Sequence, residues 1–445
     1  MRSRVVSARA KAARLYEWFV AHPPPGPFRP GFFRSPLRGP WLTSVAGFVL
    51  LIGVPLVFLT GLFSYAAYNP RLGGPGNDPT PRHGLLGFYL FSWPAHPYWL
   101  YRVNQGLHVT IGLMLIPFVL LKLWSVLPRL FAWPPATSPA QGIERLSLLF
   151  LVGGIGFEVV TGVLNAQNAY VFPFSFYTAH FYGAWVFFIA FTVHVALRLG
   201  RMLHGLGRLS FRGVMRTNTS DTLSEPFDEV GLVSAAPAVP TTSRRAVLGM
   251  AGGAAVLLAT LQAGQWVGGP LRRIALLAPR GGDVGGPGHF QVNTTFATSR
   301  IPSGQVGEAW RLLVTDGGDS VSLSRADLAS MRQSVAHLPI ACVEGWSSGD
   351  RRWEGVALRD LADLVGGRHR LRYVQVDSLQ RHGEFRSARI SHTQALDPDT
   401  LLALRVDGRD LTLDHGYPAR VIVPAAPGVH ATKWVGAIRF VRTSS

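Results

Sequence analysis

The chain contains a single cysteine among its 445 residues, Cys342. One thiol cannot form an internal disulfide, so a small disulfide-stapled scaffold is excluded. Charged residues are also scarce, at 15%, whereas apolar residues make up 48%, and this balance indicates membrane segments. The net charge of +18 does not indicate nucleic-acid binding, because the basic residues lie mainly beside apolar segments rather than in one stripe. The length allows two or three domains.

Five apolar segments are each close to the ~20 helical residues that cross a bilayer. They cover residues 41–65, 105–131, 146–164, 177–199 and 246–267. We expect the first four to form an all-α membrane bundle within residues 41–200. The fifth, within residues 244–268, is expected to be a tether helix. The preceding residues 1–40 are basic and Pro-rich, and they do not have the pattern of a cleavable signal peptide.

The distribution of basic residues predicts the orientation of these segments. Arginine and lysine are frequent in residues 1–40 and between residues 198 and 245, and the region around the second-to-third loop carries Lys122, Arg129 and Arg145. Residues 66–104 have fewer, namely Arg71, Arg82 and Arg102, and residues 165–176 contain none. The positive-inside rule therefore places the N-terminus in the cytoplasm. Residues 201–243 become a cytoplasmic linker, and everything after residue 268 becomes extracytoplasmic. We expect a multi-pass protein of the cytoplasmic membrane.

A pair of arginines precedes the fifth segment, in the run Ser243-Arg244-Arg245-Ala246-Val247-Leu248. This run resembles an internal twin-arginine export signal. The alternative is ordinary positive charge at the cytoplasmic end of a span. The position favours a signal, because a domain that folds around a cofactor before export would need an exporter of folded proteins.

Three histidines lie in the predicted spans, where histidine is costly and usually functional. His108 and His180 each lie in the first turn of parallel spans, so two imidazoles could bind one haem iron near the outer face. His194 follows His180 by fourteen residues, about 21 Å along the helix and about 40° around it. This spacing resembles the ligand helix of di-haem membrane cytochromes b, but Lys122 occupies the matching inner position. One outer haem b is therefore better supported than two.

Alternatives to haem binding stay open for each histidine. His108 and His180 could hydrogen-bond to neighbouring helices, and His194 could lie in the inner headgroup region. Glu158 lies inside the third span, where a carboxyl is either protonated or paired. It could belong to a proton path to a quinone, or it could be a structural partner of a nearby hydroxyl or amide.

Residues 270–445 have a different texture, which predicts an extracytoplasmic α+β domain with its own core. Short alternating runs predict strands, and two patterns predict short helices. The predicted strands include Trp310–Val314, Tyr373–Val376 and Ala419–Val423, and the predicted helices are Ser324–Met331 and Leu358–Val365.

Three runs in this domain occur in an informative order. They are Phe290-Gln291-Val292-Asn293, then Cys342-Val343-Glu344-Gly345-Trp346-Ser347 with Trp353 to Leu358, then Gly416-Tyr417-Pro418-Ala419-Arg420 to Pro424 with Gly428 and Lys433-Trp434-Val435. Together they resemble the sulfite-oxidase-type molybdopterin domain. The resemblance implies that Cys342 is the catalytic thiolate ligand of molybdenum, a soft donor for a metal that is bound through sulfur.

The same resemblance implies that Asn293, Arg420, His430 and Lys433 bind the pterin and its phosphate. Alternatives are a buried structural role for Cys342, a solvated strand position for Arg420 and a surface cation at Lys433. Thr294 stands where the family often has histidine.

The segment after the cysteine also bears on the substrate. Glu344-Gly345-Trp346-Ser347 stands where sulfite oxidases have an arginine-rich stretch, and it is more similar to the bacterial periplasmic methionine-sulfoxide reductase branch. A carboxylate beside the metal disfavours an anion such as sulfite. Arg351 and Arg352 follow closely and could still line a pocket.

The sequence thus predicts a membrane-bound molybdopterin-dependent oxidoreductase. Four membrane helices would carry haem b, and the fifth would tether the molybdopterin domain. Electrons would pass between molybdenum and the quinone/quinol pool while oxygen is transferred at a small-molecule or protein-sulfoxide substrate. The alternatives are a cofactor-free binding module on a membrane anchor, and a molybdoenzyme without haem that uses an external electron partner.

Overall fold

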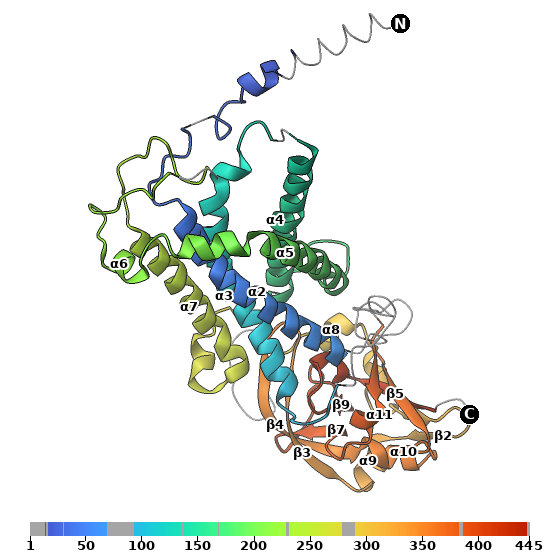
Figure 1. The fold of residues 1–445 in the computed structure, drawn as a ribbon. Coiled ribbons are helices and arrows are strands. Elements are labelled where there is room, and N and C mark those ends of the chain that lie inside the picture. Colours follow the sequence, from blue (N-terminus) through green and yellow to red (C-terminus); the bar gives the residue numbers. More distant parts are fainter. Residues whose placement is uncertain are drawn as a thin grey trace, which may run out of the picture. The chain divides into compact units, whose positions relative to one another are not determined.

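The computed structural model describes residue 14 and residues 17–29, 31–68, 93–135, 138–167, 169–227, 231–277, 290–381 and 386–442. Within them are five helices long and apolar enough to span a bilayer (Figure 1). They are α2 (Pro40–Tyr68), α3 (Leu100–Leu130), α4 (Pro139–Ala166), α5 (Phe176–Leu206) and α7 (Arg244–Val267). The five predicted apolar helices are therefore confirmed, with ends that lie up to seven residues from the expected ones. Crossing of a membrane and its direction stay predictions.

Large apolar side chains on these helices are exposed, as lipid-facing residues would be. Ile189 and Leu197 of α5 are 60% and 70% exposed, and Leu149 of α4 is 65% exposed. A helix satisfies its own backbone hydrogen bonds, so such side chains can face hydrocarbon without leaving polar groups bare. Some basic residues used for the orientation lie outside the described residues. These are Arg2, Arg4, Arg9, Lys11, Arg71 and Arg82.

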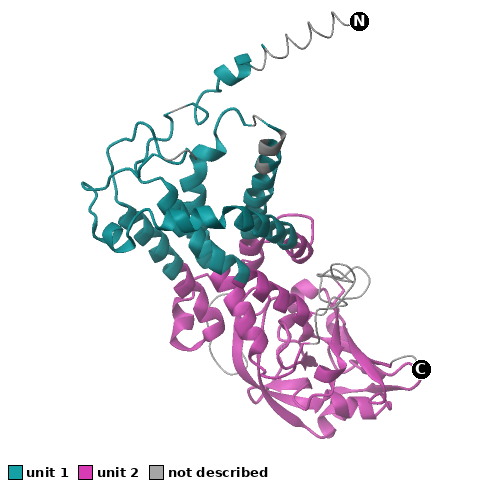
Figure 2. Ribbon diagram, in the orientation of Figure 1, with its two compact units in different colours: residues 1–55, 113–159, 183–257 teal, residues 56–112, 160–182, 258–445 magenta. Residues whose placement is uncertain are grey.

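The chain divides into two compact units, and all five long helices contribute to both (Figure 2). Unit 1 comprises residues 1–55, 113–159 and 183–257. Unit 2 comprises residues 56–112, 160–182 and 258–445. Unit 2 therefore combines one part of each helix with the whole C-terminal domain. This division differs in kind from the predicted boundaries, which cut the chain between helices rather than within them.

In unit 1, the predicted cytoplasmic linker is packed rather than loose. Glu225 is 4% exposed, and its carboxylate accepts hydrogen bonds from the backbone N–H of Trp41 at 3.0 and 3.2 Å. It therefore satisfies a free N–H in the first turn of α2. Burial raises the pKa of Glu225. The linker also contributes α6 (Phe211–Arg216), which Ser210 caps.

The C-terminal domain is an α+β fold with two five-stranded sheets. One sheet has the order β2-β1-β10-β5-β6, and the other has β3-β4-β7-β8 with β9 paired to β7. All strand pairs are antiparallel except β1 with β10. The strands are β1 (Leu312–Thr315), β2 (Ser320–Leu323), β3 (Ser334–Ala341), β4 (Ser347–Ala357), β5 (Leu371–Ser378), β6 (Ser387–Ser391), β7 (Leu401–Val406), β8 (Arg409–Asp410), β9 (Arg420–Ile422) and β10 (Val435–Arg442).

Short helices connect these strands. They are η2 (Gly269–Ile274), α8 (Phe296–Ser299), η3 (Ser303–Gln305), α9 (Arg325–Ser330), α10 (Leu358–Asp363), α11 (His392–Ala395) and η4 (Gly428–His430). A core of fully buried side chains from both sheets includes Leu312, Val356, Leu402 and Phe440. The predicted strands at β1, β5 and β9 and the predicted helices at α9 and α10 are confirmed. Their alternating apolar residues are the ones that face this core.

Candidate functional site

Cys342 lies in the tight turn that joins β3 to β4. Its backbone N–H donates to the carbonyl of Trp346 at 2.9 Å, and its carbonyl accepts from the N–H of Gly345 at 3.0 Å. Gly345 has a φ of +85°, a left-handed conformation that glycine adopts without strain. The hairpin therefore fixes the position of the Cys342 side chain, which is only 4% exposed.

The same turn is held against helix α3. Gln105 donates a buried hydrogen bond to the carbonyl of Val343 at 2.5 Å. A Cβ on Gly345 would lie 2.8 Å from Cγ2 of Val109, so only glycine allows this close approach. Nearby, Arg102 forms an ion pair with Asp350 at 3.1 Å. Residues at the beginning of α3 thus contact the cysteine turn directly.

Four polar residues of the C-terminal domain are buried, and one of them, Arg420, interacts electrostatically with Cys342. Arg420, His430, Gln291 and Thr432 are each at most 5% exposed. Several of their side-chain atoms have no hydrogen bond of normal geometry among the described residues. These atoms are Nε of Arg420, Oγ1 of Thr432, the side-chain amide of Gln291 and both ring nitrogens of His430. Buried polar atoms without partners are costly. The His430 ring also interacts with the backbone of Tyr68. The remaining polar atoms offer donors and acceptors to a polar ligand or to ordered water.

The electrostatics of the cluster favour an anion. Burial lowers the pKa of Arg420 to about 9, and the Cys342 thiol is close enough to counter this effect in part. The guanidinium stays cationic at neutral pH, and it donates one bond, to the carbonyl of His415, at 3.2 Å. Burial lowers the pKa of His430 to about 4, so its ring is neutral and offers one donor and one acceptor. A bound phosphate would pair with Arg420, and the polar atoms of a heterocycle would suit His430.

Asn293 and Lys433 occupy different roles from those expected of simple ligands. Asn293 accepts a hydrogen bond from the N–H of Thr294 at 2.9 Å. Lys433 is 9% exposed, and its ammonium donates to the backbone carbonyls of Thr294 and Asp414. The alternatives of a surface lysine and a solvated Arg420 are thus wrong. Lys433 ties the loop of Asn293 to the segment before β9.

These residues fit a molybdopterin. The donor set consists of one thiol, one uncompensated guanidinium and several buried polar atoms without partners. A soft thiolate suits molybdenum, and a guanidinium suits a phosphate. Both features lie in one buried region of unit 2.

The two outer histidines meet in unit 2. The ring centroids of His108 and His180 are 6.3 Å apart, and the ring planes are nearly perpendicular, at 87°. A metal–imidazole bond is about 2 Å long. The separation therefore leaves room for one metal ion between two facing ring nitrogens.

Hydrogen bonds determine which nitrogen of His108 is free. Its Nδ1 lies 3.0 Å from the carbonyl of Val57 and 3.2 Å from Oγ1 of Thr60. A carbonyl can only accept, so Nδ1 carries the proton and Nε2 keeps the lone pair that binds a metal. On the other side, Oγ1 of Thr161 lies 2.9 Å from Nδ1 of His180. Such outer partners orient metal-binding imidazoles.

A glycine follows each of these threonines and makes space beside the imidazole. A Cβ on Gly61 would lie 3.1 Å from Cε1 of His108, and a Cβ on Gly162 would lie 3.3 Å from Cε1 of His180. The pair is therefore surrounded by two Thr-Gly dipeptides, one from α2 and one from α4.

The inner candidates lie in unit 1. Lys122 donates a hydrogen bond to the carbonyl of Thr43 at 2.8 Å. His194 has Lys122 and Arg129 as its charged neighbours. A side chain on Gly183 of α5 would overlap the carboxylate of Glu158. The roles predicted for His194 and Glu158 stay predictions. The Nζ of Lys122 already donates to a backbone carbonyl, which is consistent with the preference for a single haem.

Arg351 and Arg352 do not combine into an anion pocket. Arg351 forms an ion pair with Asp407 at 3.1 Å, and Arg352 pairs with Glu354. Both contacts lie along β4 and its neighbours. The expectation that these arginines line the substrate site is therefore not supported by the geometry.

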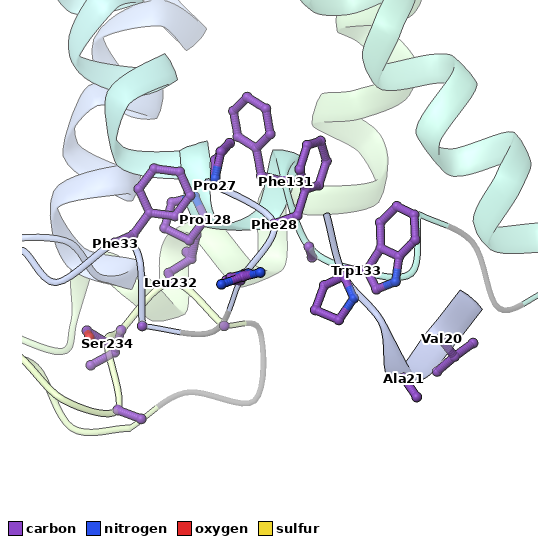
Figure 3. Close-up of a pocket in the computed structure, with 17 residues that line it drawn as sticks. Val20, Ala21, Pro27, Phe28, Phe33, Pro128, Phe131, Trp133, Leu232 and Ser234 are labelled. Carbon is purple, nitrogen blue, oxygen red and sulfur yellow. The ribbon is translucent and has the colours of Figure 1, made fainter. Parts of the chain in front are cut away.

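Unit 1 contains a separate cavity of about 480 Å³, shown in Figure 3. Its walls are largely aromatic and prolyl, and they include Phe28, Phe33, Phe131 and Trp133. Three stretches build it: the N-terminal segment, the end of α3 and residues 231–235. None of the predicted site residues lines the cavity. Its walls bring the N-terminal segment and the linker together with the end of α3.

Several residues of this site escaped sequence reasoning. Thr60-Gly61 and Thr161-Gly162 support the two histidines, and the repeated Thr-Gly pair in two apolar segments was a usable signal. Gln291 and Thr432 lie within or beside the runs that were recognised. Gln105 could have been noticed as a polar residue one turn before His108.

Comparison with known proteins identifies the class of the C-terminal domain. A family profile described as the oxidoreductase molybdopterin binding domain matches residues 299–445. Residues 299–445 are therefore similar to molybdopterin-binding oxidoreductase domains.

Individual relatives show how far the similarity extends. The chain is 33% identical to a sulfite oxidase of Arabidopsis thaliana over 117 residues, which cover 23% of this chain and 30% of that protein. It is 28% identical to the uncharacterised oxidoreductase YuiH of Bacillus subtilis over 160 residues, 35% of this chain and 79% of that protein. The sulfane dehydrogenase SoxCD of Paracoccus pantotrophus is 18% identical, with a TM-score of 0.28, over 31% of this chain and 39% of that one. The match thus spans less than a third of the plant enzyme.

Proposed function

We propose that this chain is a membrane-bound molybdopterin oxidoreductase that exchanges electrons between an extracytoplasmic molybdenum centre and membrane quinone through one b-type haem. One observation carries the link between the two centres. Gln105 of α3 holds the carbonyl of Val343 at 2.5 Å, and His108 lies one turn further along the same helix. The cysteine turn and the histidine pair therefore belong to one packed region of unit 2.

The chemistry requires two kinds of electron transfer. Molybdenum bound to pterin supplies two-electron oxygen-atom transfer, whereas haem iron passes one electron at a time. Reduction of an oxide XO consumes two electrons and two protons and yields X and water, and oxidation of X is the reverse. In either direction, quinol and quinone balance the two electrons and two protons. Tethering both centres in one chain gives them a high effective concentration.

The residues of this chain have distinct tasks in that scheme. Cys342 would supply the protein thiolate to molybdenum, and Arg420 would pair with the cofactor phosphate. His430 and Gln291 would hydrogen-bond to the pterin. His108 and His180 would hold the haem, each oriented through its Nδ1.

Membrane purification tests this proposal. Full-length protein from cells grown with molybdate should contain molybdenum and show the α-band of a reduced b-type cytochrome. A quinol analogue should reduce the haem directly, and an oxide substrate of the molybdenum centre should then reoxidise it. In the opposite direction, a reduced substrate should reduce the haem, and quinone should reoxidise it. Molybdenum without any haem band would support the alternative in which an external partner carries electrons. Absence of molybdenum would favour the cofactor-free binding module.

Replacement of Thr161 with valine is expected to raise the midpoint potential of the haem. The threonine accepts the Nδ1 proton of His180, which strengthens the imidazole as a donor to ferric iron. Losing this acceptor should raise the potential by about 60 mV, a tenfold change in a one-electron equilibrium. Redox titration of the visible spectrum measures the shift.

Thr60→Val is the matched control for that change. His108 keeps its second acceptor, the carbonyl of Val57 at 3.0 Å. The shift in Thr60→Val should therefore be smaller than that in Thr161→Val. Equal potentials in Thr161→Val and the wild type would show that the hydroxyl does not tune a haem ligand.

If Arg244 and Arg245 form a twin-arginine export signal, the exporter must recognise them before the chain has folded around Arg244. Arg244 is 6% exposed, and its guanidinium donates to the carbonyls of Leu37, Pro36 and Leu223 at 2.9–3.2 Å. An exporter would therefore have to bind this arginine before these contacts form. Arg245 is the more accessible of the two, and it donates to Met215 and Asn218 at 3.3 Å.

Substitution of both arginines by lysine should leave the C-terminal domain inside the cell. Protease protection of that domain in spheroplasts, scored with an antibody to the C-terminus, measures its location. Arg201→Lys with Arg208→Lys keeps the same charge and is the control. If the double Arg244→Lys, Arg245→Lys protein exports normally, the pair is only positive-inside charge.

A further inference from the structure

Three tyrosines from the membrane helices lie beside the cysteine turn. Tyr68 ends α2, Tyr101 lies in the first turn of α3 and Tyr177 lies in the first turn of α5. Tyr68 and Tyr101 belong to the same buried cluster as Cys342, and Tyr177 packs against that cluster. All three precede residues 299–445, so they lie outside the region that matches the family profile.

The burial of Cys342 depends on these helices. Cys342, Tyr68 and Tyr101 are 4%, 4% and 1% exposed. Trp93 joins the same cluster, and its indole N–H donates to the carbonyl of Ala425 at 2.7 Å. A site of this kind on an isolated C-terminal domain would be open toward α3. In the whole chain it is covered by aromatic side chains.

The hydroxyls of these tyrosines differ in their hydrogen-bond partners. Tyr101 lies 3.3 Å from Oγ of Ser64, which donates to Gln105 at 2.7 Å. Tyr177 lies 3.5 Å from the hydroxyl of Tyr170. The hydroxyl of Tyr68 is buried and, among the described residues, has no hydrogen bond of normal geometry. It interacts with the hydroxyl of Tyr101, and it can turn toward a stronger acceptor that binds in the site.

A carboxylate lies on the wall side of the cysteine turn, whereas the buried Arg272 donates to the carbonyl of Ser347 at the beginning of β4. Glu344 follows Cys342 closely and is 4% exposed, and its carboxylate accepts from the indole of Trp346 at 2.6 Å. Glu344 interacts electrostatically with Tyr177. An anionic substrate would therefore meet a carboxylate and phenols on this side. A neutral molecule with an accepting oxygen fits better.

We propose that Tyr68, Tyr101 and Tyr177 close the Cys342 site and form its substrate wall. The substrate is then a small neutral molecule whose oxygen accepts a hydrogen bond from Tyr68. An oxide carried on a folded protein is excluded, because the helix ends occupy the space that a protein surface would need. This inference rests on the proposed molybdenum function for its chemistry, but the wall itself can be tested without the cofactor.

The sole thiol provides the first test. Full-length protein made without molybdenum cofactor is placed in lipid nanodiscs and treated with N-ethylmaleimide or with a maleimide attached to polyethylene glycol. The bulky reagent should modify Cys342 at least about tenfold more slowly, because it reaches the thiol only through local opening. Tyr68→Ala and Tyr177→Ala should increase the rate at which the bulky reagent modifies Cys342. Tyr182→Ala, at a 40% exposed position of α5, should not.

The second test uses the loaded enzyme and removes only a hydroxyl. With dimethyl sulfoxide and trimethylamine N-oxide as probes and a reduced dye as donor, Tyr68→Phe should raise KM about tenfold, the effect of one lost hydrogen bond. Its kcat should change less. Tyr182→Phe should match the wild type. Methionine sulfoxide on an oxidised protein should be turned over far more slowly than the free amino acid.

Each result decides one part of the inference. Equal labelling rates for small and bulky maleimides in the wild type would overturn the wall, whatever the metal content. An unchanged KM in Tyr68→Phe would overturn the role of its hydroxyl. A molybdenum-loaded enzyme that reduces protein-bound and free sulfoxide equally fast, or that turns over neither oxide probe, would overturn the substrate class. Protein that never acquires molybdenum would instead refute the proposed function.

Discussion

Replacement of Cys342 with serine is expected to abolish substrate turnover while leaving the fold and the haem spectrum intact. Serine has nearly the same shape, and the backbone bonds of the turn to Trp346 and Gly345 do not involve the side chain. A hydroxyl is a much poorer ligand than a thiolate for a soft metal site. Turnover should fall below about a thousandth of the wild type, a barrier increase of about 4 kcal/mol or more.

The measurement is dye-linked activity per haem in purified protein. Gly345→Ala is a useful companion, because it strains the same turn and presses on Val109 without removing the thiol. We expect it to reduce activity in part rather than abolish it. A Cys342→Ser protein with wild-type turnover would mean that the sole thiol is a structural residue.

Replacement of His108 or His180 with alanine is expected to have the opposite pattern. The b-type bands should fall to less than about one tenth of the wild type, since each variant loses a ligand and not merely an outer partner. Quinone-linked turnover should fall with the bands. Dye-linked turnover should persist, because a small dye can deliver electrons to the molybdenum domain directly.

His194→Ala is the matched control, since His194 lies on the same helix α5 as His180. A single outer haem predicts that this variant keeps the full spectrum. Loss of about half of the haem in His194→Ala would instead indicate a second, inner haem. Retention of the bands in both His108→Ala and His180→Ala would contradict the assignment of the outer pair.

Much of the fold could be predicted because its signals are local. The five apolar helices follow from length and composition, and β1, β5 and β9 follow from alternating residues that face one core. The packing of the linker could not be predicted in this way. Glu225 contacts Trp41 across 184 positions of sequence, and no local pattern contains that information.

In the candidate site, too, residues in recognisable runs could be predicted, whereas tertiary contacts could not. Cys342 and Arg420 were found because they lie in runs of recognisable order, and their burial agrees with roles in cofactor binding. The cofactor-binding role of Lys433 stays a prediction, and its ammonium donates to two backbone carbonyls in the structure. These bonds depend on tertiary contacts, which bring the loop of Asn293 beside the segment before β9.

The packing of the apolar helices against the cysteine turn could not be predicted from the sequence. Tyr68 and Tyr101 look like ordinary aromatic residues at helix ends, where membrane proteins commonly have them. Their meaning comes from packing against a turn more than 240 positions away. If Cys342 binds molybdenum as proposed, the helices also complete the surroundings of the metal ligand, in addition to raising an effective concentration.

Joint quantification of molybdenum and haem in full-length protein purified from membranes tests the central claim most directly. The account predicts about one molybdenum and about one b-type haem per chain. It also predicts that molybdenum, but not haem, is lost in Cys342→Ser. Well-folded wild-type protein from molybdate-supplied cells that contains no molybdenum would contradict it.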